Sequence, residues 1–260
     1  MNLSVLSQTA ILALLCRVVE SGKKNPVFSD PMAVLCLDRL MSIASAEEKE
    51  RITKWRKRYA GNPLDARERA LTAKRFDTIA GLFIADHPGC TVINLACGFD
   101  TRFWRIENEK CKYIELDLPE VIELKRELLK DQLDYELIGC SVLNPAWIDQ
   151  ATSNGNGNFL LLAEALVYYL PGQEVTRLLE VIARKFTRSQ LVLDMAPEKF
   201  TKGLWKKIFQ LHSRAWEIDV SFVSGIKDPR DIESYGKGLK VTGVAKGNVG
   251  PIITVSINAE

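Results

Sequence analysis

Short, nearly all-apolar runs alternate with helix-like segments between residues 91 and 195, and this alternation constrains the fold more than any other feature. Strands that are apolar on both faces are typical of a parallel sheet covered by helices on both sides. We therefore predict an α/β core built on a parallel sheet. The predicted strands cover residues 91–95, 112–116, 135–138, 159–163 and 190–194, and the clearest helices between them cover 119–130, 146–151 and 173–186.

The two ends of the chain have a different character. Residues 1–75 are predicted to be helical, and a further helix rich in aromatic residues is predicted over residues 198–216. Two β runs, 239–245 and 250–257, flank a short turn and are predicted to pair as a hairpin. Residues 1–30 and 196–225 are predicted to be helical and to lie outside the sheet, so we expect them to form the substrate side of any binding site.

Composition and charge exclude several kinds of protein. The 260 residues are 47 % hydrophobic and carry a formal net charge of +2, as a folded protein does and a disordered chain does not. The balanced charge creates no basic field, so nucleic acid is not an expected partner. The apolar run 10–16 is too short to span a bilayer, and no membrane partner is expected.

The cysteines and histidines point away from a metal protein. Six cysteines are scattered without C-x-x-C spacing, and only two histidines are present, so we expect no metal site. Scattered cysteines in a chain of this size indicate a reducing, cytoplasmic location.

A turn of small residues follows the first predicted strand. Residues 94–100 read NLACGFD, and small side chains there let a ligand approach the backbone at the carboxyl end of a strand. The single glycine, Gly98, departs from the G-x-G-x-x-G pattern that binds a pyrophosphate, and Asp100 would repel one. The turn therefore favours a nucleoside without phosphate groups, of which S-adenosylmethionine is the commonest.

The second predicted strand ends in an acid. Asp117 follows Gly98 by nineteen residues, and an acid at this place in such a fold binds the hydroxyl groups of a ribose. The alternative is that Asp117 caps the helix that begins at Pro119. The spacing of the turn and the acid favours the ribose.

Four stretches of the chain resemble the leucine carboxyl methyltransferase family. Residues 94–105 (NLACGFDTRFWR) resemble the first motif of the family, residues 115–125 the second, and residues 161–171 the motif at its fourth strand. Residues 7–20, together with the Asp-Pro-Met-Ala of residues 30–33, resemble the N-terminal signature of a bacterial branch similar to the tetracenomycin polyketide carboxyl methyltransferases. The resemblance covers nearly the whole chain in register.

This resemblance implies one class I methyltransferase domain, with a Rossmann-like, seven-stranded, mostly parallel sheet whose last strand is antiparallel. Residues 1–75 would then be an N-terminal helical cap, 91–195 the cofactor-binding core, 196–225 a substrate lid and 226–260 the C-terminal hairpin of the sheet. The implied function is S-adenosylmethionine-dependent O-methylation of a carboxylate on a small, polyketide-like molecule. Two alternatives stay open: methylation of a protein C-terminal carboxylate, and a non-catalytic S-adenosylmethionine-binding protein.

The resemblance also implies which residues contact the cofactor. Asp117 would bind the ribose, and Leu118, Ser141 and Val142 would surround the adenine. Glu164 would lie near the methionine amino group. The residues of the glycine turn that would lie against the methionine part are Asn94, Ala96, Cys97, Gly98 and Asp100.

One expected cofactor ligand is missing from the chain. The family binds the cofactor's carboxylate with an arginine on the helix before the first strand, five residues before an aspartate. Counting back from Asp77 gives Thr72. We predict that Lys74 replaces that arginine, with Arg69 as the alternative.

No catalytic side chain is predicted. A carboxylate is ionised at neutral pH and needs no general base, whereas a phenol with a pKa of about 10 needs one. His212, on the helix predicted over residues 198–216, is the candidate base if the acceptor is a phenol.

Overall fold

The structure is a computed structural model that describes residues 4, 7–106, 108–153, 157–214, 216–218 and 220–258. The side chains of Pro63, Asn108 and His212 lie outside that description.

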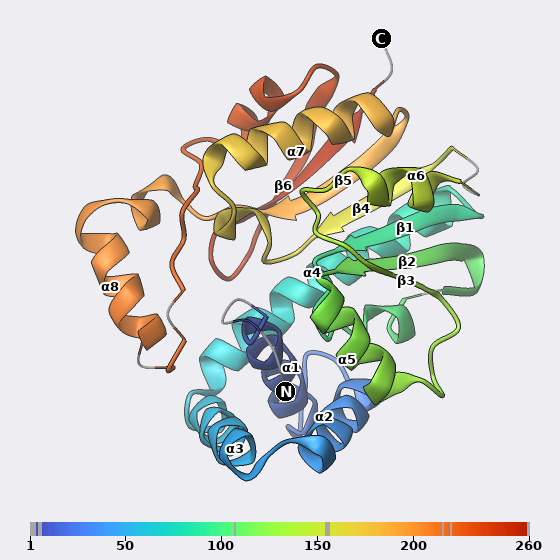
Figure 1. The fold of residues 1–260 in the computed structure, drawn as a ribbon. Coiled ribbons are helices and arrows are strands. Elements are labelled where there is room, and N and C mark those ends of the chain that lie inside the picture. The colour runs from blue at the N-terminus through green and yellow to red at the C-terminus, as the bar shows by residue number, and fades with distance from the viewer. Residues whose placement is uncertain are drawn as a thin grey trace.

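A seven-stranded sheet with the order β3-β2-β1-β4-β5-β7-β6 forms the centre of the molecule (Figure 1). The first five of these strands run parallel, and β7 is antiparallel to both of its neighbours. The predicted α/β fold, with a hairpin that ends the sheet, is confirmed. The strands are β1 (Cys90–Leu95), β2 (Cys111–Asp117), β3 (Glu136–Gly139), β4 (Phe159–Ala163), β5 (Ser189–Asp194), β6 (Leu239–Lys246) and β7 (Pro251–Ile257).

Helices cover both faces of the sheet, which explains why its central strands are mostly apolar. Ile93 and Leu161 point into a core shared with α6 and α7. Their neighbours Val92 and Leu160 point the other way, into a core shared with α4. Successive side chains of a strand face opposite sides of a sheet, so apolar residues are needed on both faces of each central strand. The α-helices are α1 (Thr9–Ser21), α2 (Pro31–Ile43), α3 (Ala46–Gly61), α4 (Pro63–Asp86), α5 (Pro119–Leu129), α6 (Ala146–Thr152), α7 (Gly172–Lys185) and α8 (Gly203–Arg214).

The first three helices pack around a core of their own beside the carboxyl ends of the strands (Figure 1). Leu14 of α1, Leu40 of α2 and Trp55 of α3 are buried in this core together with Phe99, which follows β1. The start of α2 is fixed by Asp30, whose side chain accepts a hydrogen bond from Ala33 N at 3.0 Å, as an N-cap residue does. The other oxygen of this carboxylate, Oδ2, accepts a hydrogen bond from Thr101 Oγ1 at 2.6 Å, which holds the start of α2 against the segment that follows the first strand.

The single helix predicted over residues 198–216 is wrong. The segment forms a short 3-10 helix, Glu198–Thr201, and then α8. Gly203 separates the two because its φ of +56° lies in the left-handed region, which interrupts a right-handed helix and favours glycine. As a result α8 stands apart from the sheet at one side of the molecule (Figure 1).

Candidate functional site

A cavity of about 430 Å³ lies where the carboxyl ends of β1, β2 and β4 face α1 and α8. The order of the strands reverses between β1 and β4, and ligands of open α/β sheets bind at such a switch point. Its volume falls within the range of small-molecule sites. The lining includes every predicted cofactor residue except Lys74: Asn94, Ala96, Cys97, Gly98, Asp100, Asp117, Leu118, Ser141, Val142 and Glu164.

The turn after β1 has a backbone that admits little but small residues. Gly98 and Ala96 both have a φ of +53°, in the left-handed region. A Cβ atom on Gly98 would lie 2.9 Å from the Cβ of Ala10, so α1 packs directly on this glycine. A larger residue at position 98 would be strained and would displace α1.

Asp117 joins the ends of the first two strands. One carboxylate oxygen, Oδ2, accepts a hydrogen bond from Gly98 N at 2.6 Å, and Oδ1 accepts one from Leu118 N at 2.7 Å. Burial raises the pKa of this carboxyl, and the two backbone hydrogen bonds oppose that rise. The N-cap residue of α5 is Leu118, and no side-chain hydrogen bond caps that helix, so the structure gives Asp117 no capping role.

Behind the cavity, one arginine holds three carboxylates. The guanidinium of Arg102 is completely buried; its Nε donates to Asp77 at 2.7 Å, and its Nη1 donates to Asp100 at 2.6 Å. Its Nη2 donates to Glu164, which lines the cavity. Arg105 adds ion pairs to Asp77 and Asp100. A fork of donors that satisfies several carboxylates is the geometry in which arginine stabilises buried negative charge.

The acids of this network have different pKa values. Burial alone would raise the pKa of Asp100, but Arg102 and Arg105 outweigh it and hold that pKa well below its usual range. Burial raises the pKa of Glu164, and Arg102 only partly opposes this. Burial and the neighbouring charge of Glu164 raise the pKa of Asp194, at the end of β5, to about 7. Asp100 is therefore a fixed negative charge, whereas Asp194 titrates near neutral pH.

The network was not predicted, although a sequence signal for it existed. Arg102 and Arg105 both belong to the motif at residues 94–105, three residues apart, but their partners come from elsewhere. Asp77 lies on α4, and Glu164 follows β4. Only the fold brings these acids together with the motif.

Lys74 does not reach the cavity. Its Nζ donates to the backbone carbonyl of Val27 at 3.0 Å, and it is absent from the lining of the cavity. Thr72 stands where the family has arginine; it is buried, and its Oγ1 accepts a hydrogen bond from Asn248 N at 2.8 Å. The structure thus places the predicted substitute away from the other predicted site residues.

Two other arginines line the cavity. Arg17 of α1 is buried and donates from Nη2 to the carbonyl of Phe99 at 2.7 Å. Arg69 of α4 is paired through Nε with Asp65 at 3.3 Å, and its side chain is 41 % exposed. Of the two, Arg69 has more of its surface free to meet a ligand.

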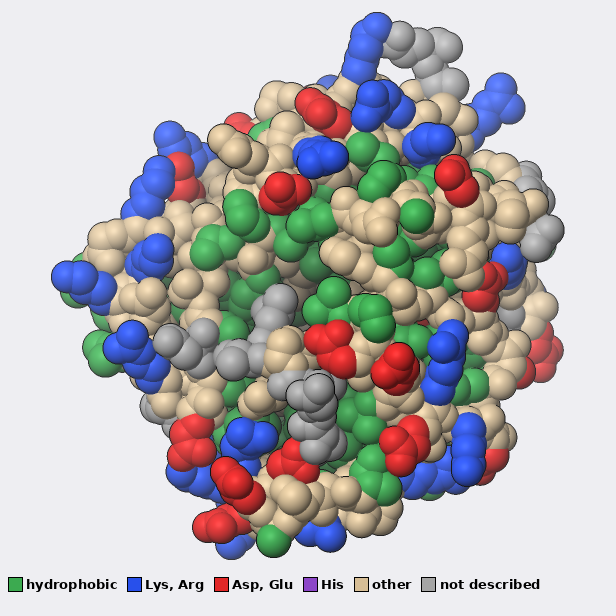
Figure 2. All heavy atoms as spheres, viewed as in Figure 1, with side chains coloured by type: hydrophobic (Ala, Val, Ile, Leu, Met, Phe, Trp, Pro, Cys, Tyr) green, Lys and Arg blue, Asp and Glu red, His purple; other side chains and the backbone are tan. Residues whose placement is uncertain are grey.

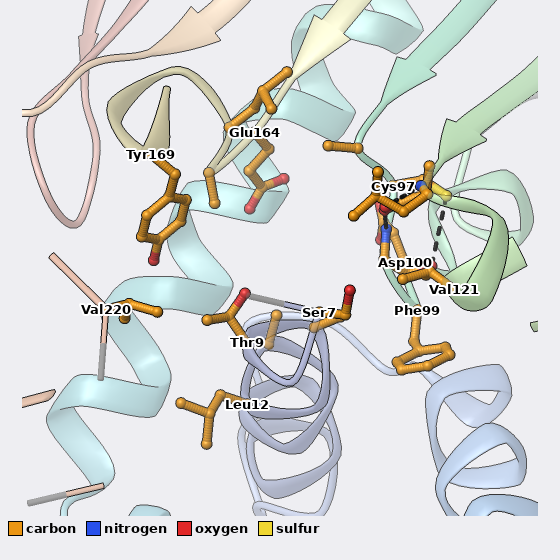
Figure 3. A pocket seen from close by; sticks show the side chains of 18 of the residues that line it. Ser7, Thr9, Leu12, Cys97, Phe99, Asp100, Val121, Glu164, Tyr169 and Val220 are labelled. Atoms are coloured by element: carbon orange, nitrogen blue, oxygen red, sulfur yellow. Dashed lines mark hydrogen bonds between the residues drawn. The ribbon is translucent and has the colours of Figure 1, made fainter. Parts of the chain in front are cut away.

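The far wall of the cavity is apolar and aromatic. Figure 3 shows Tyr169 and Val220 facing Thr9 and Leu12 of α1 across the space that opens from Glu164. Phe209 of α8 lies on the same wall and stacks on Phe222, with ring centroids 3.9 Å apart. Two predicted lid residues differ: Trp216 is buried and lines the cavity, whereas Trp205 is 50 % exposed and does not.

The described parts of the chain hold no cluster of three or more metal-ligating side chains. Nor is any described helix both long and apolar enough to cross a membrane.

Comparison with protein families and curated sequences gives consistent results. The sequence pattern of the family described as leucine carboxyl methyltransferase matches residues 10–183. The tetracenomycin polyketide synthesis O-methyltransferase of Streptomyces glaucescens is 28 % identical over 245 residues, which cover 92 % of this chain and 82 % of that protein. An S-adenosyl-L-methionine-dependent methyltransferase of Gibberella zeae is 25 % identical and covers 90 % of this chain and 79 % of its own length.

Solved structures share the fold at low sequence identity. An O-methyltransferase family protein from Burkholderia thailandensis matches with a TM-score of 0.53 and 17 % identity, over 90 % of this chain and 74 % of that one. Magnesium protoporphyrin IX methyltransferase from Synechocystis, solved with S-adenosylhomocysteine, matches with a TM-score of 0.53 and 15 % identity, over 86 % of this chain and 99 % of that one.

Proposed function

The chain belongs to the leucine carboxyl methyltransferase family and is an S-adenosylmethionine-dependent methyltransferase, and from this we propose that it methylates the carboxylate of a small, apolar, polyketide-like acid. The observation that carries the proposal is the pairing of two unlike walls in one cavity. The glycine turn and Asp117 form one wall, and aromatic and aliphatic side chains form the other. An apolar acid fits the second wall, and the relative from Streptomyces glaucescens is named for polyketide synthesis.

The residues on the first wall fit the cofactor. The close approach at Gly98 leaves backbone exposed to a ligand, and Asp117 keeps lone pairs on both oxygens for the ribose hydroxyls. Ser141 and Val142 line the same cavity and would surround the adenine, and Glu164 would bind the methionine amino group. These assignments rest on the cavity lining and on the family resemblance.

Arg69 replaces the family arginine in this proposal. It lies on the same helix as Thr72 and lines the cavity, whereas Lys74 does not. Tyr59 and Tyr169 line the cavity as well, and a carboxylate bound at Arg69 would share its guanidinium with Asp65, which pairs with Nε at 3.3 Å. This geometry suits the carboxylate of the cofactor, with Arg17 deeper in the same wall.

The chain's contribution to catalysis is alignment and exclusion of water. When bound, S-adenosylmethionine supplies an activated sulfonium methyl group. The aromatic wall holds the acceptor in line with that position and keeps water away from it. A carboxylate acceptor is already ionised, so it needs no general base. This is consistent with the cavity, because the carboxylate of Glu164 that lines it is already bound by Arg102.

The decisive experiment is methyl transfer to a panel of aromatic and aliphatic acids, with matched phenols and a peptide that ends in a leucine carboxylate. We expect a base-labile methyl ester on the small acids and no product on the peptide. The variant His212→Ala should change turnover by less than about tenfold, because losing acid–base catalysis typically costs 10²–10⁴-fold. A base-stable methyl ether with a large loss in this variant would overturn the carboxylate proposal, and product on the peptide would favour the protein substrate. The cytoplasmic location stays a prediction.

A further inference from the structure

The outer side of α8 carries a stripe of exposed apolar side chains. Leu204, Trp205, Ile208 and Leu211 expose 70 %, 50 %, 45 % and 68 % of their surface. Positions 204, 208 and 211 follow the i, i+4, i+7 spacing of one helix face, and Trp205 lies at the edge of this face, one turn before Phe209. Single exposed apolar residues are ordinary, but four on one helix of twelve residues form a patch that calls for a partner.

This stripe is distinct from the cavity. The residues of α8 that line the cavity are Phe209 and Ser213, on its inner side. None of the four residues of the stripe belongs to that lining. The helix is therefore apolar on a side that the substrate cavity does not use.

Basic residues surround the stripe. Between residues 198 and 214 the only acid is Glu198, whereas the whole chain has a net charge of only +2. Nζ of Lys199 lies 5.5 Å from the ring centroid of Trp205, so a lysine ammonium group lies against one residue of the stripe. Figure 2 shows lysine and arginine side chains along the edge of the molecule where α8 lies. The basic residues of this segment are Lys199, Lys202, Lys206, Lys207 and Arg214.

We propose that α8 docks on an anionic lipid surface. A helix with Leu, Ile and Trp on one side and lysines beside them lies in the plane of a membrane interface, with its apolar side among the acyl chains and its cations at the headgroups. This is surface binding, and it needs no spanning segment. It revises the expectation, drawn from the sequence, that the chain has no membrane partner.

Charge argues against a second copy as the occupant. Two copies that paired through this face would bring two strongly basic segments together, and like charges at close range repel. An anionic surface instead supplies the charge that complements the segment.

Docking would also orient the cavity. Phe209 and Ser213 lie on the inner side of the same helix, so the acceptor wall would lie next to the lipid. An apolar acid dissolved in the membrane could then reach the cavity directly. This consequence rests on the proposed function, whereas the docking itself does not.

The test is co-sedimentation of the full chain with vesicles of phosphatidylcholine alone and of phosphatidylcholine mixed with phosphatidylglycerol. We expect binding to the mixed vesicles that weakens as salt is raised. The variant Leu204→Ser/Ile208→Ser/Leu211→Ser should bind at least about tenfold more weakly, because the apolar area that enters the lipid is lost. Leu82→Ser is the matched control, since Leu82 is 64 % exposed on α4, away from the stripe.

A second variant removes positive charge and leaves the four apolar side chains of the stripe in place. Lys199→Gln/Lys207→Gln should weaken binding by about fivefold for each lysine removed. Circular dichroism shows whether the variants fold. Equal binding to neutral and anionic vesicles would overturn the proposal. So would absence of vesicle binding, whether the chain is monomeric or forms a dimer that the triple variant abolishes.

Discussion

The two walls of the cavity are built on different physical principles. The cofactor wall stands on the ends of three parallel strands, and buried ion pairs centred on Arg102 hold it from behind. The acceptor wall comes from helices and loops outside the sheet, among them Phe209 and Val220, and is held by apolar packing. A wall held by buried charge is intolerant of change, whereas an apolar wall can be reshaped by substitution.

That contrast explains how the members of one family can share the methyl donor S-adenosylmethionine and differ in the molecules that they methylate. The glycine turn and Asp117 are tied to each other by the hydrogen bond from Gly98 N, so a substitution of Asp117 also disturbs the turn. Phe209 of the acceptor wall is held instead by stacking on Phe222. The following predictions probe the contrast.

The largest effect is expected at Arg102. Replacing it by Met should lower the free energy of unfolding by about 3–5 kcal/mol, because Asp77, Asp100 and Glu164 would lose their shared buried cation. Urea denaturation measures this. Lys54→Met is the control, since Lys54 forms an exposed ion pair with Glu217 and should matter by less than about 1 kcal/mol. Equal losses in the two variants would break the contrast between buried and exposed charge.

Asp194, at the end of β5, should make the stability of the folded chain depend on pH. Its pKa of about 7 in the folded protein exceeds the unfolded value of about 3.9, so between these values the folded chain holds a proton that the unfolded chain lacks. The free energy of unfolding therefore falls by about 1.4 kcal/mol per pH unit as pH rises through this interval. Asp194→Asn should remove this part of the slope, because Asn can still accept the hydrogen bond from Ala165 N. The free energy of unfolding is measured by denaturation at several pH values across this interval. If it fell as steeply with pH in Asp194→Asn as in the parent chain, the prediction would be wrong.

Asp117→Ala should weaken binding of S-adenosylhomocysteine by about 10–150-fold, the range of a charged hydrogen bond of about 1.5–3 kcal/mol. Calorimetry measures this, and NAD should not compete. Ser141→Ala, on the same wall, removes a neutral partner and should cost less. If Ser141→Ala had the larger effect, the ribose assignment of Asp117 would be untenable.

The smallest effect concerns the replaced arginine. Arg69→Met should weaken S-adenosylhomocysteine binding by about tenfold, near the low end for a charged hydrogen bond, because Arg69 is partly exposed. Lys74→Met should leave the affinity within about twofold. An unchanged affinity in Arg69→Met, with a raised KM for the acceptor acid, would assign Arg69 to the acceptor wall instead.

The sheet could be predicted from the sequence because the burial of each strand shows in the side chains of that strand alone. An all-apolar run such as residues 159–163 follows from burial on both faces, and the turn at Gly98 follows from the small residues themselves. The buried network could not be predicted, since Arg102 meets acids from α4 and from the end of β4 only after folding. Those contacts depend on tertiary structure alone.

The position of Lys74 outside the cavity has a geometric cause that helix periodicity explains. Arg69 of α4 lines the cavity, whereas Thr72 and Lys74 do not. At about 100° per residue, Lys74 lies roughly 140° around the helix from Arg69. The angle around α4 therefore decides which basic residue of this helix lines the cavity.

The contact between α1 and the glycine turn has a consequence for the order in which the protein is made. Ala10 packs on Gly98, and Arg17 binds the carbonyl of Phe99, which lies 82 residues further along the chain. During synthesis, α1 leaves the ribosome long before the turn that it covers, and Phe209 of the opposite wall emerges later still. The apolar helix α1 therefore stays unpacked in the nascent chain until the turn that it covers has been synthesised.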